Sequence, residues 1–269
     1  MVVLVTGAGG QLGQALQYIS NNYPQIQFVF CTSSQLDITN IENCRLVFDK
    51  YKPHYCINAA AYTAVDKAES EPETAYAINA TGAKNIAEVC KEHNTVLIHI
   101  STDFVFDGTK TEPYTTEDAT NPLGIYGKTK LQGEQKIQKT WEKHFIVRTS
   151  WVYSLFGNNF YKTMLRLAKE RSEISVVNDQ IGCPTNAVDL AKFLLEIVES
   201  QKPKVKSFGV YHFSGDEVMS WYDFTLKIFK ENNISIKVNP IPTSAFATPA
   251  KRPKYSVLDN EKNQLVHKQ

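Results

Sequence analysis

The chain has 269 residues, of which 42% are hydrophobic, and its formal net charge is +1. A chain of this length and apolar content builds one large α/β domain or two smaller ones, which excludes an intrinsically disordered protein. The near-zero charge gives no reason to expect a nucleic-acid partner, and no apolar run approaches the roughly 18 residues of a membrane helix. The first residues, MVVLVTG, lack the basic region of a signal peptide, so we expect a cytoplasmic protein without a membrane partner.

Cysteine and histidine are too scattered to predict a metal site. The five cysteines contain no C-x-x-C pair, and the six histidines contain no H-x-x-x-H motif. We therefore expect reduced cysteines that serve as small core residues, with no disulfide and no zinc. No catalytic metal is predicted, and a magnesium ion is allowed only in a non-catalytic role.

Short β-branched runs alternate with helical patterns through the first part of the chain. Strands are predicted at Val2–Val5, Phe28–Cys31, Tyr55–Asn58, Val96–Ile100 and Phe145–Arg148. Helices are predicted from the first glycines to about Tyr18, from Ile41 onward, and as one long amphipathic segment over Glu71–Glu92. This alternation predicts an α/β fold of the Rossmann type, a doubly wound parallel sheet with right-handed crossovers.

Beyond Trp151 the alternation loosens. Helices are predicted at Phe160–Lys169, Ala187–Glu199 and Ser220–Glu231, and the prolines at 240, 242, 249 and 253 predict loop. We expect residues 1–150 to form a dinucleotide-binding domain, with part of 180–215 packing back on it. Residues 151–269 are expected to form mainly a smaller, interleaved, C-terminal substrate-binding lobe.

A glycine-rich turn follows the first predicted strand. The segment VLVTGAGGQLG places Gly7, Gly10 and Gly13 at the opening of a helix. Glycines there let the turn close, let backbone N–H groups approach a pyrophosphate and let the helix pack on the sheet. The alternative, a merely flexible turn, is the weaker interpretation because the motif comes directly after a strand and before an amphipathic helix.

The residues after the second predicted strand bear on the choice of nucleotide. The stretch CTSS at 31–34 has neither the acidic residue typical of NAD sites nor an arginine. Ser33 and Ser34 could bind a 2′-phosphate, so we favour NADPH and leave NADH open. Asp37 and Ile38 either contact the adenine or belong to the cap of the next helix.

The segment YGKTK places Tyr126 and Lys130 one helical turn apart, and Thr102 lies at the end of an earlier strand. Ligands of open α/β sheets bind beyond the carboxyl ends of the strands, so the three side chains could converge beside a nicotinamide. A free tyrosine, with a pKa near 10, is a reluctant acid at neutral pH, and a nearby ammonium lowers that value. We therefore expect an acid–base site here.

Several segments resemble a known family. TGAGGQLG, NAAAYTAVDKAE, ISTDFVFDG and YGKTK are similar to the extended short-chain dehydrogenase/reductases. Within that family, RTSWVY, NNFYKTMLRLAKER, NDQIGCPT and RPKYSVLDNEK resemble the dTDP-4-dehydrorhamnose reductases. The similarity runs from residue 2 to about residue 262, and the later segments are typical of this reductase group.

The resemblance implies an oxidoreductase of cell-surface polysaccharide biosynthesis. It would use NADPH to reduce the 4-keto group of dTDP-4-dehydro-L-rhamnose, a small-molecule dTDP-sugar, to dTDP-L-rhamnose. Tyr126 would donate the proton, Lys130 would tune it, and Thr102 would bind the sugar oxygen. The other implied substrate contacts are Asp103, Trp151 and Arg252. The implied cofactor contacts, besides Tyr126 and Lys130, are Gly7, Gly10, Gln11, Leu12, Gly13, Asp37, Ile38, Ala60, Ala61, Tyr62 and Thr63.

Some residues have simpler interpretations. Trp151 could be packing. Asn79 matches a position where the wider family often keeps an asparagine near the active lysine, but it could instead satisfy buried backbone groups. Asp66, in the family segment NAAAYTAVDKAE, could belong to a solvated helix start. Residues 201–269 hold 11 Lys and Arg against 6 Asp and Glu, which suits an anionic ligand such as a nucleotide diphosphate near Arg252. A solvated basic surface explains the same excess.

Other functions remain open at this point. Sugar-nucleotide dehydratases of the same family place Asp-Glu after the threonine, whereas this chain has Asp103-Phe104, and phenylalanine cannot transfer a proton. The reductases more often have tyrosine there, so Phe104 departs from both patterns. The remaining alternatives are a non-catalytic dinucleotide-binding subunit, resembling the regulatory subunit of methionine adenosyltransferase, and a reductase of another nucleotide keto-sugar. A homodimer is left open. The chain ends sooner after RPKYSVLDNEK than the family usually does, which predicts a less covered substrate lobe or a shortened sequence.

Overall fold

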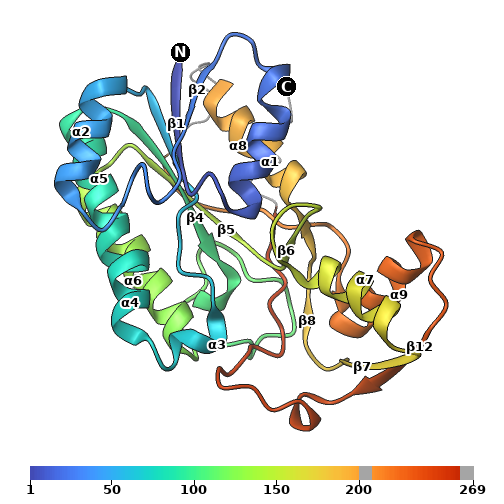
Figure 1. The fold of residues 1–269 in the computed structure, drawn as a ribbon. Coiled ribbons are helices and arrows are strands. Elements are labelled where there is room, and N and C mark those ends of the chain that lie inside the picture. The colour runs from blue at the N-terminus through green and yellow to red at the C-terminus, as the bar shows by residue number, and fades with distance from the viewer. Residues whose placement is uncertain (200–207, 261–269) are drawn as a thin grey trace.

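Six parallel strands form the central sheet of the computed structural model, which describes residues 1–199 and 208–260 (Figure 1). Their order is β10-β5-β4-β3-β1-β2. The strands are β1 (Val2–Thr6), β2 (Gln27–Phe30), β3 (Tyr55–Asn58), β4 (Val96–Thr102), β5 (His144–Thr149) and β10 (Gly209–His212). The chain moves from β1 to β2 on one side and then to β3 on the other, so the strand order reverses beside β1. A ligand crevice is expected beyond the carboxyl ends of the strands at such a reversal.

Helices cover both faces of the sheet, which confirms the predicted doubly wound α/β fold. On one face, α1 (Gln11–Ile19) packs against α8 (Ala187–Glu199) over a core of aliphatic side chains. On the other face lie α2 (Ile41–Tyr51), α5 (Ala83–Glu92) and α6 (Ile125–Thr140). Both α8 and β10 come from the second half of the chain, so that half contributes to the sheet as well as to the smaller lobe (Figure 1).

The helix predicted over Glu71–Glu92 runs without a break from Pro72 to Glu92, but its middle is π-helical. After α3 (Val65–Ala68), the chain forms α4 (Pro72–Tyr76), then a π-helical segment η2 (Ala77–Gly82), and then α5. A Cβ atom at Gly133 of α6 would lie 2.2 Å from the Asn79 carbonyl oxygen. The π-helical turn is thus in direct backbone contact with α6, and such turns are frequent at functional sites.

The smaller lobe contains α7 (Phe160–Glu170) and α9 (Trp221–Glu231), packed on the parallel pair β7 (Glu173–Val177) and β12 (Lys237–Ile241). The loop predicted around Pro240 was wrong, because Pro240 pairs with Val176 inside β12. In this two-stranded sheet β12 has a neighbour on one side only, and an edge strand tolerates a missing N–H. The short pairs are β6 (Val152–Tyr153) with β9 (Thr185–Asn186) and β8 (Ile181–Gly182) with β11 (Met219–Ser220).

Three single-turn 3₁₀ helices complete the described elements: η1 (Ser20–Asn22), η3 (Asp103–Val105) and η4 (Thr243–Ala245). None of the helices in residues 1–199 and 208–260 is long and apolar enough to cross a membrane.

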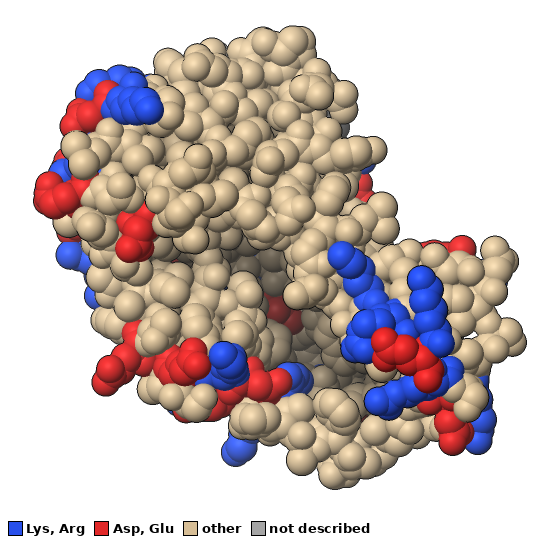
Figure 2. Space-filling view, in the orientation of Figure 1, with Lys and Arg blue, Asp and Glu red and all other residues tan. Residues whose placement is uncertain are grey.

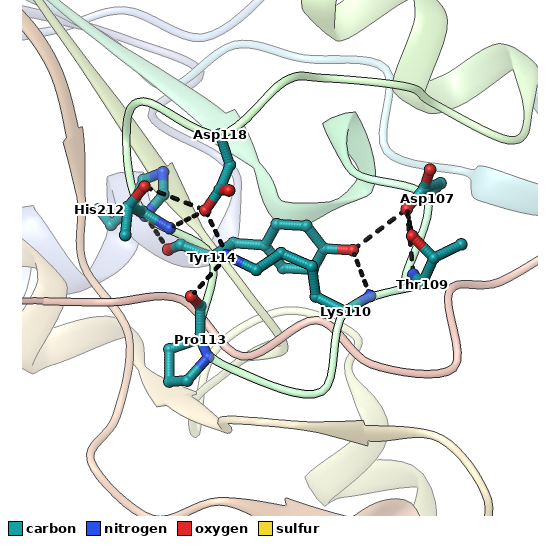
Figure 3. A network of polar contacts seen from close by, with 8 residues as sticks. Asp107, Thr109, Lys110, Pro113, Tyr114, Asp118 and His212 are labelled. Atoms are coloured by element: carbon teal, nitrogen blue, oxygen red, sulfur yellow. Dashed lines mark hydrogen bonds and ion pairs between the residues drawn. The ribbon is translucent and has the colours of Figure 1, made fainter.

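Tyr114 fastens the loop after β4 to distant parts of the chain (Figure 3). Its phenol donates to Asp107 at 3.2 Å, and its carbonyl oxygen lies 3.0 Å from Nδ1 of His212 at the end of β10. Its backbone N–H donates to Val257 in the C-terminal segment. Because Thr102 and Asp103 open this same loop, the network holds their surroundings in place.

Candidate active site

A cleft of about 1000 Å³ lies at the carboxyl edge of the sheet. Figure 2 shows the surface hollowed between the sheet and the smaller lobe. The glycine turn lines one part of the cleft, and the ends of β3 and β4, the first turns of α6 and the aromatic side chains of the lobe line the rest. The cleft therefore lies beside the reversal of strand order.

The glycine turn has the geometry of an anion site. Gly7 has a φ of +64°, and a Cβ there would lie 2.7 Å from the Ala59 carbonyl carbon across the strand reversal. A Cβ on Gly13 would lie 2.5 Å from the Gly7 oxygen. Gly10 caps α1 without a side chain, and the first turn of α1 carries no acidic residue. The N–H groups and positive end of α1 thus face the cleft, which fits the pyrophosphate of a dinucleotide.

The cofactor contacts implied by the resemblance lie mainly along one wall of this cleft. Those that line it are Gly7, Gly10, Gln11, Leu12, Gly13, Asp37, Ile38, Ala60, Ala61 and Thr63. Tyr62 does not line it, because its phenol donates to Glu71 at 2.7 Å.

Two of these residues have further contacts. The Gln11 side-chain oxygen accepts from Asn159 at 2.8 Å, which ties the glycine turn to the segment before α7. The Asp37 carboxylate accepts from the backbone N–H and hydroxyl of Thr39, so Asp37 organises the loop before α2 and also faces the cleft.

Thr102, Tyr126 and Lys130 lie in the same cleft. Thr102 ends β4, and Tyr126 and Lys130 lie in the first two turns of α6. The start of α6 is held by Glu69, whose carboxylate accepts the Ile125 N–H at 2.8 Å. The Phe104 ring meets the Tyr126 ring edge-on, with 5.5 Å between centroids. The sequence therefore brings together, from two elements, the three groups that it marked for acid–base chemistry.

Burial governs the ionisation of Tyr126 and Lys130. Burial raises the pKa of Tyr126 to about 12, partly opposed by a hydrogen bond with Thr102, while the Asp103 carboxylate raises it further. Burial lowers the pKa of Lys130 to about 8, and Glu134 opposes that change. The expected lowering of the tyrosine pKa by the lysine was wrong for this state of the protein, because burial is the largest influence on the phenol and Lys130 is not among the groups that shift its pKa. At neutral pH the phenol is protonated, as a proton donor must be.

Asn79 supports this region from the π-helical turn. Its side-chain oxygen accepts from the Tyr62 N–H at 2.8 Å, and its amide donates to the Tyr62 carbonyl and to Thr129 Oγ1, each at 3.1 Å. Because Thr129 precedes Lys130 on α6, Asn79 joins the loop after β3 to the helix of the acid–base pair.

Asp103 is a buried carboxylate beside Thr102. It is 2% exposed, and burial raises its pKa to about 6, although hydrogen bonds with Ser256 and Thr102 oppose the rise. A carboxylate kept at this cost beside a cleft is typical of a functional group. Its partner Ser256 lies in the segment RPKYSVLDNEK, and the sequence did not mark it as a site residue.

Trp151 lies in the cleft in a strained conformation. Its φ is +49°, and its ring stacks on Trp221 with 3.5 Å between centroids and 4° between planes. On Gly182, a Cβ would lie 2.6 Å from the Trp151 ring, so only glycine fits beneath it. Backbone strain in a bulky residue is typical of binding sites. Trp221, which also lines the cleft, was missed because an aromatic residue at the start of a helix predicts packing first.

Arg252 lines the cleft, but its guanidinium is engaged. It binds both carboxylate oxygens of Asp66 in α3, at 3.1 and 2.8 Å, and the Thr248 hydroxyl at 2.6 Å. The expected contact with a diphosphate therefore stays a prediction. Asp66 forms an ion pair, so it does more than start a solvated helix.

Within the described parts of the chain, no three His, Cys, Asp or Glu residues are grouped as metal ligands would be.

Known proteins match the chain over nearly its whole length. The family model described as RmlD substrate binding domain matches residues 1–269. The dTDP-4-dehydrorhamnose reductase of Aggregatibacter actinomycetemcomitans is 44% identical over 270 residues, which cover 97% of this chain and 92% of that protein.

Two solved structures share the fold along most of the chain. The dTDP-4-dehydrorhamnose reductase of Clostridium acetobutylicum has a TM-score of 0.93 and 43% identity, over 98% of this chain and 92% of that one. The enzyme of the same name from Bacillus anthracis, solved in complex with NADP, has a TM-score of 0.92 and 40% identity, over 99% of this chain and 97% of that one. From the family model, the sequence identity and the shared fold, the chain belongs to the dTDP-4-dehydrorhamnose reductase family.

Proposed function

We propose that this protein reduces the 4-keto group of dTDP-4-dehydro-L-rhamnose with NADPH, giving dTDP-L-rhamnose. The observation that carries the proposal is the presence of Thr102, Tyr126 and Lys130 in one cleft with an uncapped glycine turn. Family membership supports the same reaction.

The chain's own groups would bind, orient and protonate the substrate. Tyr126, protonated at neutral pH, gives its proton to the C4 oxygen as negative charge develops there. Thr102 and Lys130 stabilise that charge through a hydroxyl and an ammonium. Asp103 and Trp151 hold the deoxysugar, and Arg252 lies near the diphosphate. Bound NADPH supplies the hydride, and the uncapped turn at Gly7, Gly10 and Gly13 holds its pyrophosphate.

The preference for NADPH rests on the end of β2. Ser33 lines the cleft there beside Thr32, whereas Ser34, the other serine named from the sequence, does not line it. Neither Thr32 nor Ser33 carries the negative charge that would repel a 2′-phosphate. NADH, which lacks that phosphate, gains nothing from these hydroxyls. The NADP complex of the Bacillus anthracis relative agrees with this preference.

Replacing Tyr126 with Phe tests the acid. Removing one positioned proton donor is expected to lower kcat by about 10²-fold or more while the fold is retained. The measurement is NADPH oxidation with dTDP-4-dehydro-L-rhamnose. The control is Tyr161→Phe, which removes a phenol bonded to Asn232 on the outside of the smaller lobe. Undiminished turnover by Tyr126→Phe would show that another group donates the proton.

A substrate screen separates the remaining functions. The proposal predicts turnover with the dTDP-linked keto-sugar and weaker or no turnover with GDP- and UDP-linked analogues. Dinucleotide binding without oxidation in the presence of any of these sugars would favour the non-catalytic regulatory subunit. Sedimentation velocity of the same preparation tests whether the protein forms a homodimer, which the sequence left open.

A further inference from the structure

A row of buried polar side chains crosses the sheet toward Lys130. Thr6 of β1 is in register with Asn58 of β3, and Asn58 is in register with His99 of β4. Thr6, Asn58, His99 and Lys130 are each 1% exposed or less. Three neighbouring strands thus carry one continuous polar row through an otherwise apolar core, and polar groups buried in this way are costly unless they are all paired.

Each side chain in the row meets the next. Thr6 Oγ1 lies 2.6 Å from Asn58 Oδ1, and Asn58 Nδ2 lies 3.1 Å from His99 Nδ1. His99 Nε2 lies 3.4 Å from Lys130 Nζ, which also donates to the Ile100 carbonyl at 2.6 Å. At its far end, the Thr6 hydroxyl accepts the backbone N–H of Ala60 at 3.2 Å. The row therefore runs from the loop beside the glycine turn to the lysine.

The orientation of the Asn58 amide gives the row a direction. Its oxygen can only accept and faces Thr6, so the Thr6 hydroxyl donates to Asn58 Oδ1 and accepts the Ala60 N–H. The Asn58 amide nitrogen, which can only donate, then faces His99 Nδ1. That nitrogen must be the bare acceptor, and a neutral imidazole in this state carries its hydrogen on Nε2. Burial and the Lys130 charge lower the pKa of His99 and keep the ring neutral.

We propose that the row Thr6–Asn58–His99 holds His99 as its Nε2–H tautomer and makes it a positioning residue that presents a hydrogen-bond donor to the amine of Lys130. An ammonium has no lone pair to accept that hydrogen, whereas a neutral amine has one. The row therefore stabilises the neutral amine and lets Lys130 gain and lose a proton near physiological pH. This role adds a positioning residue to the proposed reaction. Its effect on turnover rests on the proposed function, whereas the tautomer of His99 does not.

Other ionisable groups around this end of the row do not replace His99. Glu134, one turn beyond Lys130 on α6, is held by Arg148 of β5 at 2.7 Å and by the Ser101 hydroxyl. The charge of His144, on β5, also lowers the pKa of His99. Burial lowers the pKa of His144 itself. On the cleft side are Tyr126 and Asp103. Among these groups, His99 is the one in hydrogen-bond reach of Nζ in addition to the Ile100 carbonyl.

The tautomer can be measured on the protein without cofactor or substrate. In protein labelled with ¹⁵N-histidine and ¹³C-lysine, NMR is expected to show His99 protonated on Nε2 and bare on Nδ1. Thr6→Val removes the hydroxyl that orients Asn58, so both tautomers should be populated and the titration midpoint of Lys130 should move to higher pH. In Asn58→Asp, the new carboxylate accepts a hydrogen bond from His99 Nδ1–H and so reverses the His99 tautomer. The titration midpoint of Lys130 should then rise by roughly one pH unit.

Thr95→Val is the matched control. Thr95 is also fully buried and precedes β4 at the other end of the sheet, where its hydroxyl donates to the Pro53 carbonyl at 2.7 Å. The control should lose a similar hydrogen bond and leave the Lys130 midpoint unchanged.

An Nδ1–H tautomer in the unaltered protein, or equal Lys130 midpoints in Thr6→Val and Thr95→Val, would overturn the proposal. If Asn58→Asp does not fold, the two valine variants still decide it. Absence of NADPH oxidation by the unaltered protein would defeat the proposed function and leave the NMR result standing.

Discussion

At the scale of single residues, the cleft keeps ionisable groups where hydration is poor. Burial moves the pKa of Tyr126 up, that of Lys130 down and that of Asp103 up. Each change favours the uncharged form of the group. The site therefore holds a protonated phenol, a lysine that exchanges its proton readily and a buried carboxylate with a pKa of about 6, all at a cost in stability that function explains.

Asp103→Asn is expected to stabilise the fold at pH 7.5. The pKa of Asp103 is raised from 3.8 to about 6, so its contribution to stability is fully present below pH 3.8 and is lost as pH rises through 6. Asparagine has no proton to lose, and the gain should be on the order of 2 kcal/mol at pH 7.5 and shrink toward zero near pH 4. Urea unfolding at both pH values measures it, and KM for the sugar should rise.

Asp107→Asn is the control of opposite sign. Hydrogen bonds from Thr109 and Asn121 lower the pKa of Asp107 to about 2. Its contribution is therefore present above pH 3.8 and is lost as pH falls through 2, so this variant should be less stable at pH 7.5. Equal stability of both variants and the unaltered protein would contradict the assignment of these pKa changes.

At the scale of elements, glycine decides how closely two helices approach the backbone of neighbouring segments. Gly13 allows α1 to lie against the turn that precedes it, and Gly133 allows α6 to lie against the π-helical segment. These contacts bring the uncapped start of α1 and the first turns of α6 to the same cleft. The positions of the anion site and the acid–base pair thus depend on two backbone-to-backbone contacts.

Gly13→Ala should weaken both stability and dinucleotide binding. The added Cβ would lie 2.5 Å from Ala8 Cα and from the Gly7 oxygen, both of which are backbone atoms. Overpacking of this kind costs about 1–3 kcal/mol. Thermal unfolding without cofactor is the measurement. Gly9→Ala is the control, since a Cβ at Gly9 would meet no atom of the described chain within 4 Å. Equal melting temperatures for the two variants would show that α1 adjusts freely.

At the scale of the whole molecule, the C-terminal segment closes the cleft from the side of the smaller lobe. It reaches α3 through the Arg252–Asp66 pair, Asp103 through Ser256 and Tyr114 through Val257. Figure 1 shows this segment, at the red end of the colour range, running beneath both lobes. Residues far apart in the sequence therefore complete one site.

Asp66→Asn tests the link between the segment and α3. Arg252 lowers the pKa of Asp66, so the pair's contribution is present above pH 3.8 and is lost as pH falls below that value. Because Asp66 is 40% exposed and Arg252 is 23% exposed, the loss at pH 7 should be about 1 kcal/mol, the upper end for such pairs. The exposed pair Lys52–Asp49 supplies the control Asp49→Asn, whose effect should be near zero. A loss no larger than the control's would mean that the pair does not hold the segment.

Local patterns predicted most of the elements, and their failures have physical reasons. The strand runs and the glycine turn were recognisable because hydrophobic runs and turn chemistry are patterns of neighbouring residues along the chain. The π-helical turn at Ala77–Gly82 was not, because no local pattern marks it and its backbone packs against Gly133, more than 50 residues away. The strand at Pro240 was missed because clustered prolines predict a loop, whereas the strand forms by pairing with β7, which lies far earlier in the chain.

By itself, the sequence determined the doubly wound fold, the family and the residues with the chemistry of a reductase, since repeating hydrophobic patterns and short motifs are local. Tertiary structure alone decided how those residues ionise and what they touch. It buried the phenol of Tyr126 and so raised its pKa, and it paired Arg252 with Asp66. It also aligned Thr6, Asn58 and His99 into one row. Hydration and hydrogen-bond direction depend on every group nearby in space, and most of those groups are distant in the chain.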